Sequence, residues 1–239
     1  MRNRFNKYFA IVFLFLLVTP YTQANEISSS KEALIIAQTQ KIYLFSILTN
    51  YLMIAMENDY KNPKKAKKAS ILSFEKNHNK LSLYLKDKNT DKIQKEFFSL
   101  KKILSEPFNI SKGTYYFQKA LSIEKNIEKI SLKLQKSTHT KLSKKLQYAK
   151  RLAVISQKIN ALYLLKTLGV SSTIISNNMQ KMMLNFKKSL NDIKKYKKIY
   201  RKLEKIYNFF KVMNDFENFV PTMVTKKSQR MLKYSNKLK

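Results

Sequence analysis

A polar triplet interrupts the most apolar helical stretch of this sequence. Residues 153–165, AVISQKINALYLL, carry Ser156, Gln157 and Lys158 between runs of aliphatic side chains. A hydroxyl, an amide and an ammonium group together can hydrogen-bond a polar molecule and neutralise an anion. Two interpretations follow: these residues line a ligand site, or they form a polar stripe that faces solvent or a neighbouring helix.

Residues able to catalyse a reaction are few and scattered. The candidates are two separate histidines and two carboxylate pairs: His78, His139, Glu124 with Glu128, and Asp215 with Glu217. Each histidine lies in a lysine- and serine-rich segment, where a surface position is commoner than a general base. Neither carboxylate pair comes with a nucleophile or a metal partner, so we interpret both as solvated charge. The sequence therefore predicts a protein that is not an enzyme.

Metal and cofactor chemistry is equally sparse. The chain has no cysteine, which removes thiolate ligands and disulfides from consideration. Met179, Met182 and Met183 could offer thioethers to copper(I), but two of them also fall on an apolar helical seam, where methionine fills gaps. We favour the packing interpretation and expect neither a metal site nor a cofactor.

The N-terminus has the pattern of a secretory signal. Three basic residues precede an unbroken apolar run at 9–18, and the tripeptide TQA at 22–24 supplies small residues for cleavage. The run is shorter than the stretch of about 20 residues that spans a bilayer. We predict that residues 1–24 are a cleaved signal peptide and that 25–239 is exported to the periplasm, with an uncleaved anchor as the alternative.

Apolar periodicity and the scarcity of glycine predict an all-α fold. The chain has two glycines, too few for a turn-rich β fold or a glycine-rich phosphate loop. Spacings that alternate between 3 and 4 residues mark coiled-coil seams. These seams are Tyr116, Ala120, Ile123, Ile127, Ile130 and Leu134; Ile175, Met179, Met182 and Phe186; and Ile199, Leu203, Ile206, Phe210 and Met213. We expect an elongated antiparallel helical bundle with coiled-coil-like packing.

Helix boundaries can be predicted at several points. Ser29 with Glu32 fits a capping box for a first helix that continues to about Asn58. Thr138 or Thr140 is the expected cap of a later helix, which we expect to end at Gly169. The first of these helices is apolar almost all round from 42 to 56, so other helices or a second subunit must cover it.

A faint internal repeat suggests two related halves. Sliding residues 36–55 onto 148–167, an offset of 112, aligns four identical pairs: Ala37 with Ala149, Ile47 with Ile159, Tyr51 with Tyr163, and Leu52 with Leu164. The offset is about half of the chain that follows the signal. We therefore predict a bundle at 25–239 made of pseudo-repeat halves at about 27–110 and 139–220.

The two repeated helices resemble a known family, the PilJ/NarX-like N-terminal sensor domain. The family occurs in type IV pili methyl-accepting chemotaxis transducers and nitrate/nitrite sensor kinases, and its pattern is similar to A-G-x-Q-R-M-L-S-Q-R followed by an aromatic-leucine pair. Here Ala37-x-x-Gln40-Lys41-Ile42 resembles the opening of that pattern. Ile155-Ser156-Gln157-Lys158-Ile159, followed by Tyr163-Leu164-Leu165, resembles its later portion.

The resemblance implies a periplasmic helical bundle, usually dimeric, that senses a small ligand between its helices. Lys41 occupies the position where the nitrate sensors have an anion-binding arginine, and lysine lacks the two-pronged hydrogen bonding of a guanidinium group. Nitrate itself is therefore a doubtful ligand. The ligand-binding residues implied are Gln40, Lys41, Ser156, Gln157 and Lys158.

Two functions follow as expectations. The first is a non-enzymatic sensor-like bundle that binds a small polar or anionic ligand, or a membrane receptor or kinase. The alternative is a cationic structural protein that contacts anionic lipid, lipopolysaccharide or cell-wall polymer, since the net charge of +33 falls only to +30 without the signal. Export makes nucleic acid an unexpected partner. The lysines spread along helix faces and cluster only at 61–68 (KNPKKAKK).

Overall fold

The chain folds entirely into helices over the residues that the structure describes. This computed structural model describes residues 26–59, 61–215 and 221–238, where eight α-helices and one short 3₁₀ helix make up all the regular structure. The all-α prediction is therefore confirmed. The signal peptide predicted at 1–24 lies outside the described residues. No described helix is both long enough and apolar enough to cross a membrane.

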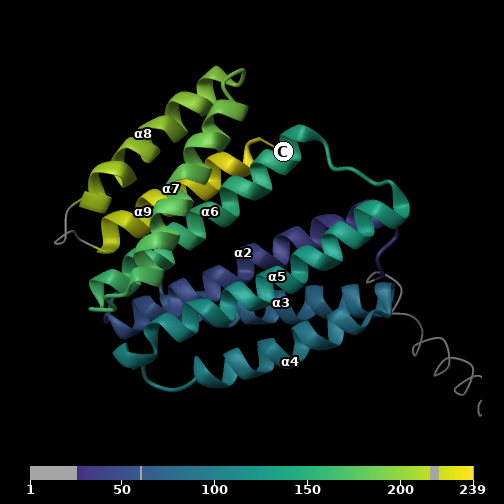
Figure 1. The fold of residues 1–239 in the computed structure, drawn as a ribbon, viewed down its shortest axis with the longest axis horizontal. Coiled ribbons are helices and arrows are strands. Elements are labelled where there is room, and N and C mark those ends of the chain that lie inside the picture. The colour runs from purple at the N-terminus through teal and green to yellow at the C-terminus, as the bar shows by residue number, and fades with distance from the viewer. Residues whose placement is uncertain (1–25, 60, 216–220, 239) are drawn as a thin grey trace, which may run out of the picture.

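The eight helices form two groups of four (Figure 1). The first group comprises α2 (Ser30–Ala55), α3 (Pro63–Leu85), α4 (Lys88–Ile103) and α5 (Gly113–Thr138), with the 3₁₀ helix η2 (Ile110–Lys112) before α5. The second comprises α6 (Lys144–Thr167), α7 (Thr173–Asp192), α8 (Lys197–Asp215) and α9 (Pro221–Asn236). Within each group every helix contacts its chain neighbours, and the first helix also contacts the fourth. Each group is thus a closed four-helix bundle, one helix longer than the halves predicted at 27–110 and 139–220.

Local sequence explains where several helices begin and end. The Ser29 hydroxyl accepts a hydrogen bond from the Glu32 backbone amide at 3.2 Å, which caps α2 as predicted. Helix α2 ends at Ala55, before the predicted Asn58. The cap of α6 is Ser143, so the prediction of Thr138 or Thr140 is wrong. Gly169, which follows the C-cap residue Leu168 of α6, takes φ of +82°, the left-handed conformation that glycine adopts most readily.

The predicted seams supply much of the core. All six seam residues of α5 and all four of α7 are buried. In α8, Leu203, Ile206 and Phe210 are buried, Ile199 is half-buried, and the side chain of Met213 lies outside the described residues. Alternating spacings of 3 and 4 place these side chains on one face of each helix. The apolar stretch of α2 is covered within the chain by α3, α5 and α6.

The two bundles meet through their first helices, α2 and α6. Lys150 donates a hydrogen bond to Thr39, Thr49 donates to the carbonyl oxygen of Gln157, and Lys158 lies over the ring of Phe45. Residue numbers rise together along the two helices, so this pair is parallel, unlike the predicted antiparallel packing. The two hydrogen-bonded pairs are separated by 111 and 108 residues, close to the repeat offset of 112. Matching positions of the two halves therefore face each other.

Candidate functional site

Helix α6 is buried on all sides around the polar triplet. Every residue from Leu152 to Leu165 is buried, because α2, α7 and α9 all pack against this helix. Ser156, Gln157 and Lys158 are 0 %, 5 % and 8 % exposed. The triplet therefore does not face solvent, and its polar groups must be satisfied inside the protein or at a pocket wall.

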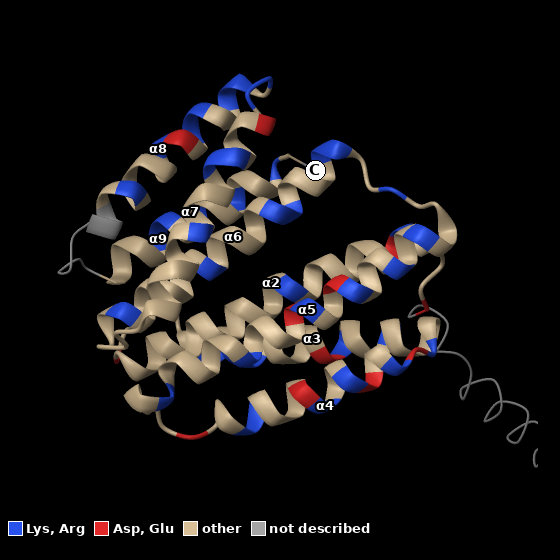
Figure 2. Cartoon of the chain, viewed as in Figure 1, with Lys and Arg blue, Asp and Glu red and all other residues tan. Residues whose placement is uncertain are grey.

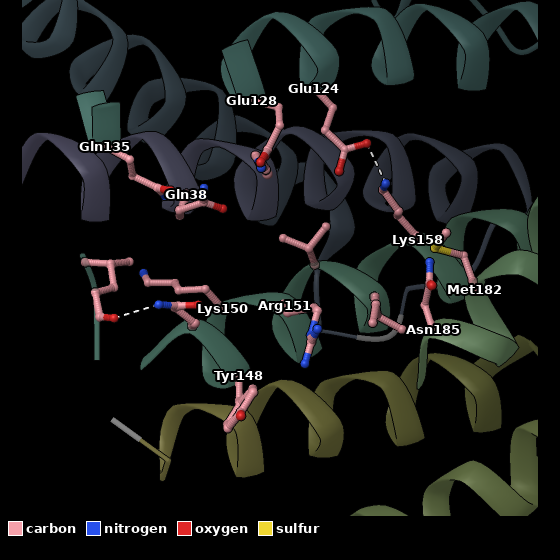
Figure 3. Close-up of a pocket in the computed structure, with 15 residues that line it drawn as sticks. Gln38, Glu124, Glu128, Gln135, Tyr148, Lys150, Arg151, Lys158, Met182 and Asn185 are labelled. Atoms are coloured by element: carbon pink, nitrogen blue, oxygen red, sulfur yellow. Dashed lines mark hydrogen bonds and ion pairs between the residues drawn. The ribbon is translucent and has the colours of Figure 1, made fainter. Parts of the chain in front are cut away.

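A pocket of about 490 Å³ opens between the two bundles on one flank of the α2–α6 pair. Its wall is built by α2, α5, α6 and α7 (Figure 3). The charged residues that line it are Lys41, Glu124, Glu128, Lys150, Arg151 and Lys158. Four cations therefore face two carboxylates, and the described wall of the pocket carries a net positive charge.

Two ion pairs lie at this pocket, and the one between α5 and α6 joins the two bundles. Glu124 and Glu128 lie one helical turn apart on α5, a spacing that places both carboxylates on the same face. Glu124 pairs with Lys158 of α6, as Figure 3 shows, and Glu128 pairs with Lys41 of α2. The ammonium group of Lys158 also lies 4.9 Å from the centre of the Phe45 ring, a cation–π contact. Lysines from the two matching helices thus converge on one helix face.

Burial weakens the proton affinity of one of these lysines. The Lys41 side chain is 8 % exposed, whereas that of its partner Glu128 is 46 % exposed. Loss of hydration lowers the pKa of Lys41 to about 8, with Lys158 acting in the same direction and Glu124 opposing both. A solvated partner compensates a buried charge incompletely. Lys41 is therefore a cation whose charged form a bound anion would stabilise.

The other two cations of the pocket are held by neighbours outside its wall. The Lys150 ammonium group donates to the Thr39 hydroxyl of α2. Arg151 pairs with Asp192, the last residue of α7. The phenol of Tyr148 and the amides of Gln38 and Gln135 add uncharged hydrogen-bonding groups to the wall. The pocket can therefore bind a small anion through both charge and hydrogen bonds.

The structure separates the five predicted site residues. Lys41 and Lys158 line this pocket together. Gln157 faces a different pocket on the opposite flank of the α2–α6 pair. Ser156 donates to the carbonyl oxygen of Ala153 in its own helix, at 2.8 Å. Gln40 is fully buried, and its amide nitrogen and oxygen find no hydrogen-bond partner among the described residues.

Sequence reasoning missed the acidic side of the pocket. Glu124 and Glu128 were expected to be solvated, yet each pairs with a buried lysine from another helix. Their separation of four residues on an amphipathic helix was the available signal, but it does not reveal which partners lie opposite. Lys150 and Arg151 were also missed, because nothing in the sequence distinguishes them from the many other cations.

The fold and the site together define a class: two four-helix bundles joined by a parallel helix pair, with a cationic pocket between them. No known protein family, curated protein or solved structure matches the chain. The described residues contain no group of three histidine, cysteine or acidic side chains arranged to hold a metal ion. The pocket is therefore interpreted from its own chemistry.

Proposed function

We propose that this protein is an exported, non-enzymatic, sensor-like bundle that binds a small anion in the pocket between its halves. The observation that carries the proposal is the convergence of Lys41 and Lys158, from the paired helices α2 and α6, on one pocket of net positive charge. The pKa of Lys41, about 8, supports it, because an anion would complete the charge compensation that Glu128 supplies from a solvated position. The resemblance to PilJ/NarX-like sensor domains agrees with this role.

A ligand in this pocket would act on the relative position of the two bundles. It would contact residues of α2 and α5 in one bundle and of α6 and α7 in the other. A ligand shifts a conformational equilibrium only through its different affinity for the two states. An anion that holds both bundles would favour the arrangement in which Lys41 and Lys158 are close. A membrane receptor or kinase could then recognise that arrangement.

Thermal denaturation of the full chain with added anions tests this proposal. The probes are chloride, nitrate, phosphate, acetate and glutamate, each at low and high concentrations of an inert salt. A bound anion raises the melting temperature by mass action. We expect a shift that persists at high salt and is lost in both Lys41→Met and Lys158→Met. Lys76→Met, which removes one exposed cation from α3, should keep the shift. A shift that Lys76→Met reduces as much as Lys41→Met would contradict a defined pocket.

A second candidate function rests on the corner where α7 meets α8. Residues 187–205 carry nine exposed cations: Lys187, Lys188, Lys194, Lys195, Lys197, Lys198, Arg201, Lys202 and Lys205. Six of these cations fall within the nine residues 194–202, a density similar to that of the five lysines at 61–68, so the expectation that lysines cluster only at 61–68 is wrong. Figure 2 shows cations along α8 and at its junction with α7. Such a surface would attract an anionic lipid or polymer.

Cosedimentation with vesicles distinguishes this second function from the first. We expect the full chain to bind vesicles that contain about one third anionic lipid, and binding to fall steeply as salt rises. Replacing Lys194, Lys195, Lys197 and Lys198 with glutamine should abolish binding. The matched control replaces Lys64, Lys65, Lys68 and Lys76, four exposed lysines of α3, and should retain most of it. Equal losses in the two variants would show attraction by net charge alone.

A further inference from the structure

A second pocket lies on the opposite flank of the α2–α6 pair. It encloses about 510 Å³ and is lined by residues of α2, α3, α6 and α9, with Lys61 before α3. By order in the chain, the counterparts in the two bundles are α2 and α6, α3 and α7, and α5 and α9. The first pocket is surrounded by α2, α5, α6 and α7, and the counterparts of these four helices are α6, α9, α2 and α3, which surround the second pocket. Counterpart helices therefore surround the two pockets, although the second pocket is lined by later residues of α2 than the first.

The chemistry of the second pocket differs from that of the first. Eight of its lining side chains end in uncharged amide or hydroxyl groups that can hydrogen-bond a ligand: Ser46, Thr49, Asn50, Gln157, Asn160, Thr225, Gln229 and Asn236. Its described wall contains no carboxylate, and its two charged residues are Lys61 and Lys233. A ligand here would meet hydrogen-bond donors and acceptors rather than paired charges.

Four of the polar side chains of this pocket belong to the protein interior. Thr49, Gln157, Asn160 and Thr225 are between 1 % and 5 % exposed. The Thr225 hydroxyl donates to the Asn160 side-chain oxygen at 3.1 Å, which holds α9 against α6 and fixes the orientation of that amide. The side-chain oxygen of Gln229 is also buried and finds no hydrogen-bond partner among the described residues. An unsatisfied buried acceptor costs about 1–3 kcal/mol, so a ligand that donates to it would bind more tightly.

We propose that this second pocket binds a small uncharged solute rich in hydroxyl or amide groups, of about the size of a monosaccharide. An apolar ligand would leave the buried amides and hydroxyls unpaired. An anion would find only Lys61 and Lys233, and both of these lysines are exposed to solvent, which weakens their attraction for it. Hydroxyl and amide groups, in contrast, can donate to Gln229 and accept from the side-chain amides of Gln157 and Asn160. The two related pockets would then bind ligands of different classes.

Titration of the full chain with uncharged solutes tests the proposal. The probes are glucose, galactose, N-acetylglucosamine, inositol and urea, followed by calorimetry and by the NMR signals of the side-chain amides. At least one probe should bind with a Kd below about 1 mM and shift the Gln157 and Asn160 amide signals. Gln229→Leu should weaken binding at least tenfold, about 1.4 kcal/mol. Lys41→Met, which alters only the other pocket, should leave the affinity unchanged.

Three results would overturn this proposal. The first is that no probe binds with a Kd below about 1 mM. The second is that binding survives both Gln229→Leu and Asn50→Leu in variants whose helical content and melting temperature match those of the parent chain. The third is that only charged compounds bind, with a dependence on Lys233. None of these results bears on anion binding beside Lys41, so the proposals for the two pockets are tested independently.

Discussion

At the scale of single residues, Lys41 links stability to pH. Its pKa of about 8 in the folded chain compares with an ordinary value of 10.5. Below pH 8 the lysine is protonated in both the folded and the unfolded chain, so burial of the charge lowers stability by a constant amount. Between pH 8 and 10.5 the unfolded chain binds more protons, so the free energy of unfolding rises with pH. The full rise is on the order of 3 kcal/mol.

Lys41→Met removes this dependence. We expect the variant to be more stable than the parent at pH 7, and the difference to shrink as pH rises from 8 to 10.5. Urea denaturation at several pH values measures both free energies. Burial also lowers the pKa of Lys67 and raises that of Tyr51, but both groups are present in both proteins, so their effects cancel in the comparison. Parallel curves for the two proteins across this range would show that Lys41 keeps its ordinary pKa in the folded chain.

Gln40 is a second residue whose burial lowers the stability of the folded chain. Its side chain is fully buried and its amide finds no partner among the described residues, which costs about 1–3 kcal/mol. Gln40→Met keeps a similar shape without the polar atoms, and should raise the free energy of unfolding by about 1–2 kcal/mol. Gln94→Met, at an exposed site on α4, should change it by less than about 0.5 kcal/mol. A loss of stability in Gln40→Met would mean that the amide is hydrogen-bonded in solution.

At the scale of the helices, the sequence predicted what depends on local pattern. The seam of α5 from Tyr116 to Leu134 is buried as expected, because spacing alone determines which side chains share a helix face. The cap of α2 at Ser29 was also predictable, because it depends only on residues that are adjacent in the sequence. The partners of Glu124 and Glu128 were not predictable, because they come from α2 and α6, which are distant in sequence. For the same reason, the sequence did not reveal that Lys41 and Lys158 line one pocket, Gln157 another, and Ser156 and Gln40 neither.

One contact between helices depends on the absence of a side chain. Gly113, the first residue of α5, packs against Val170 in the turn after α6, and a Cβ atom at Gly113 would collide with both methyl groups of Val170. Next to it, the hydroxyls of Thr114 and Ser172 are 3.1 Å apart. The start of α5 is therefore fitted closely to the second bundle.

A double-mutant cycle tests this fit. Gly113→Ala would gain up to about 1 kcal/mol of helix propensity, but the collision with Val170 costs about 1–3 kcal/mol, so we expect a net loss of stability. In a Val170→Ala background the collision disappears, and Gly113→Ala should become neutral or stabilising. Chemical denaturation of the four proteins gives the coupling free energy. A coupling free energy near zero would mean that the backbone moves apart to accept the extra methyl group.

At the scale of the whole molecule, the offset of the internal repeat matches the arrangement of the two bundles, whereas the predicted ends of the two halves do not match the ends of the bundles. The offset of 112 agrees with the register in which α2 faces α6. The predicted halves missed the fourth helix of each bundle, α5 and α9, because the similarity covers only the first helices. Other helices cover those first helices on several sides. A buried position accepts fewer residue types than an exposed one, so similarity between the halves is retained there. The exposed helices carry mainly lysine and polar residues, which leave little pattern to compare.

Charge is distributed unevenly over the two bundles. Residues 144–239 contain 23 lysine and arginine side chains and four acidic ones, whereas the other eleven acidic residues lie in 26–143. The first bundle can therefore form ion pairs such as Lys101 with Glu75 and Lys133 with Asp87, while the second bundle has few acidic residues to pair with its cations. Repulsion within the second bundle opposes its compact state.

Salt should therefore stabilise this protein. Raising sodium chloride from about 10 to 300 mM shortens the screening length from about 30 Å to below 8 Å, which weakens repulsion across the α7–α8 corner. We expect the melting temperature to rise over this range, and most of the rise to disappear when Lys194, Lys195, Lys197 and Lys198 become glutamine. The matched change at Lys64, Lys65, Lys68 and Lys76 should preserve more of it, because acidic residues are more frequent in the first bundle. A melting temperature that falls with salt would instead show that ion pairs outweigh repulsion, and the cationic corner would then impose no measurable cost on folding.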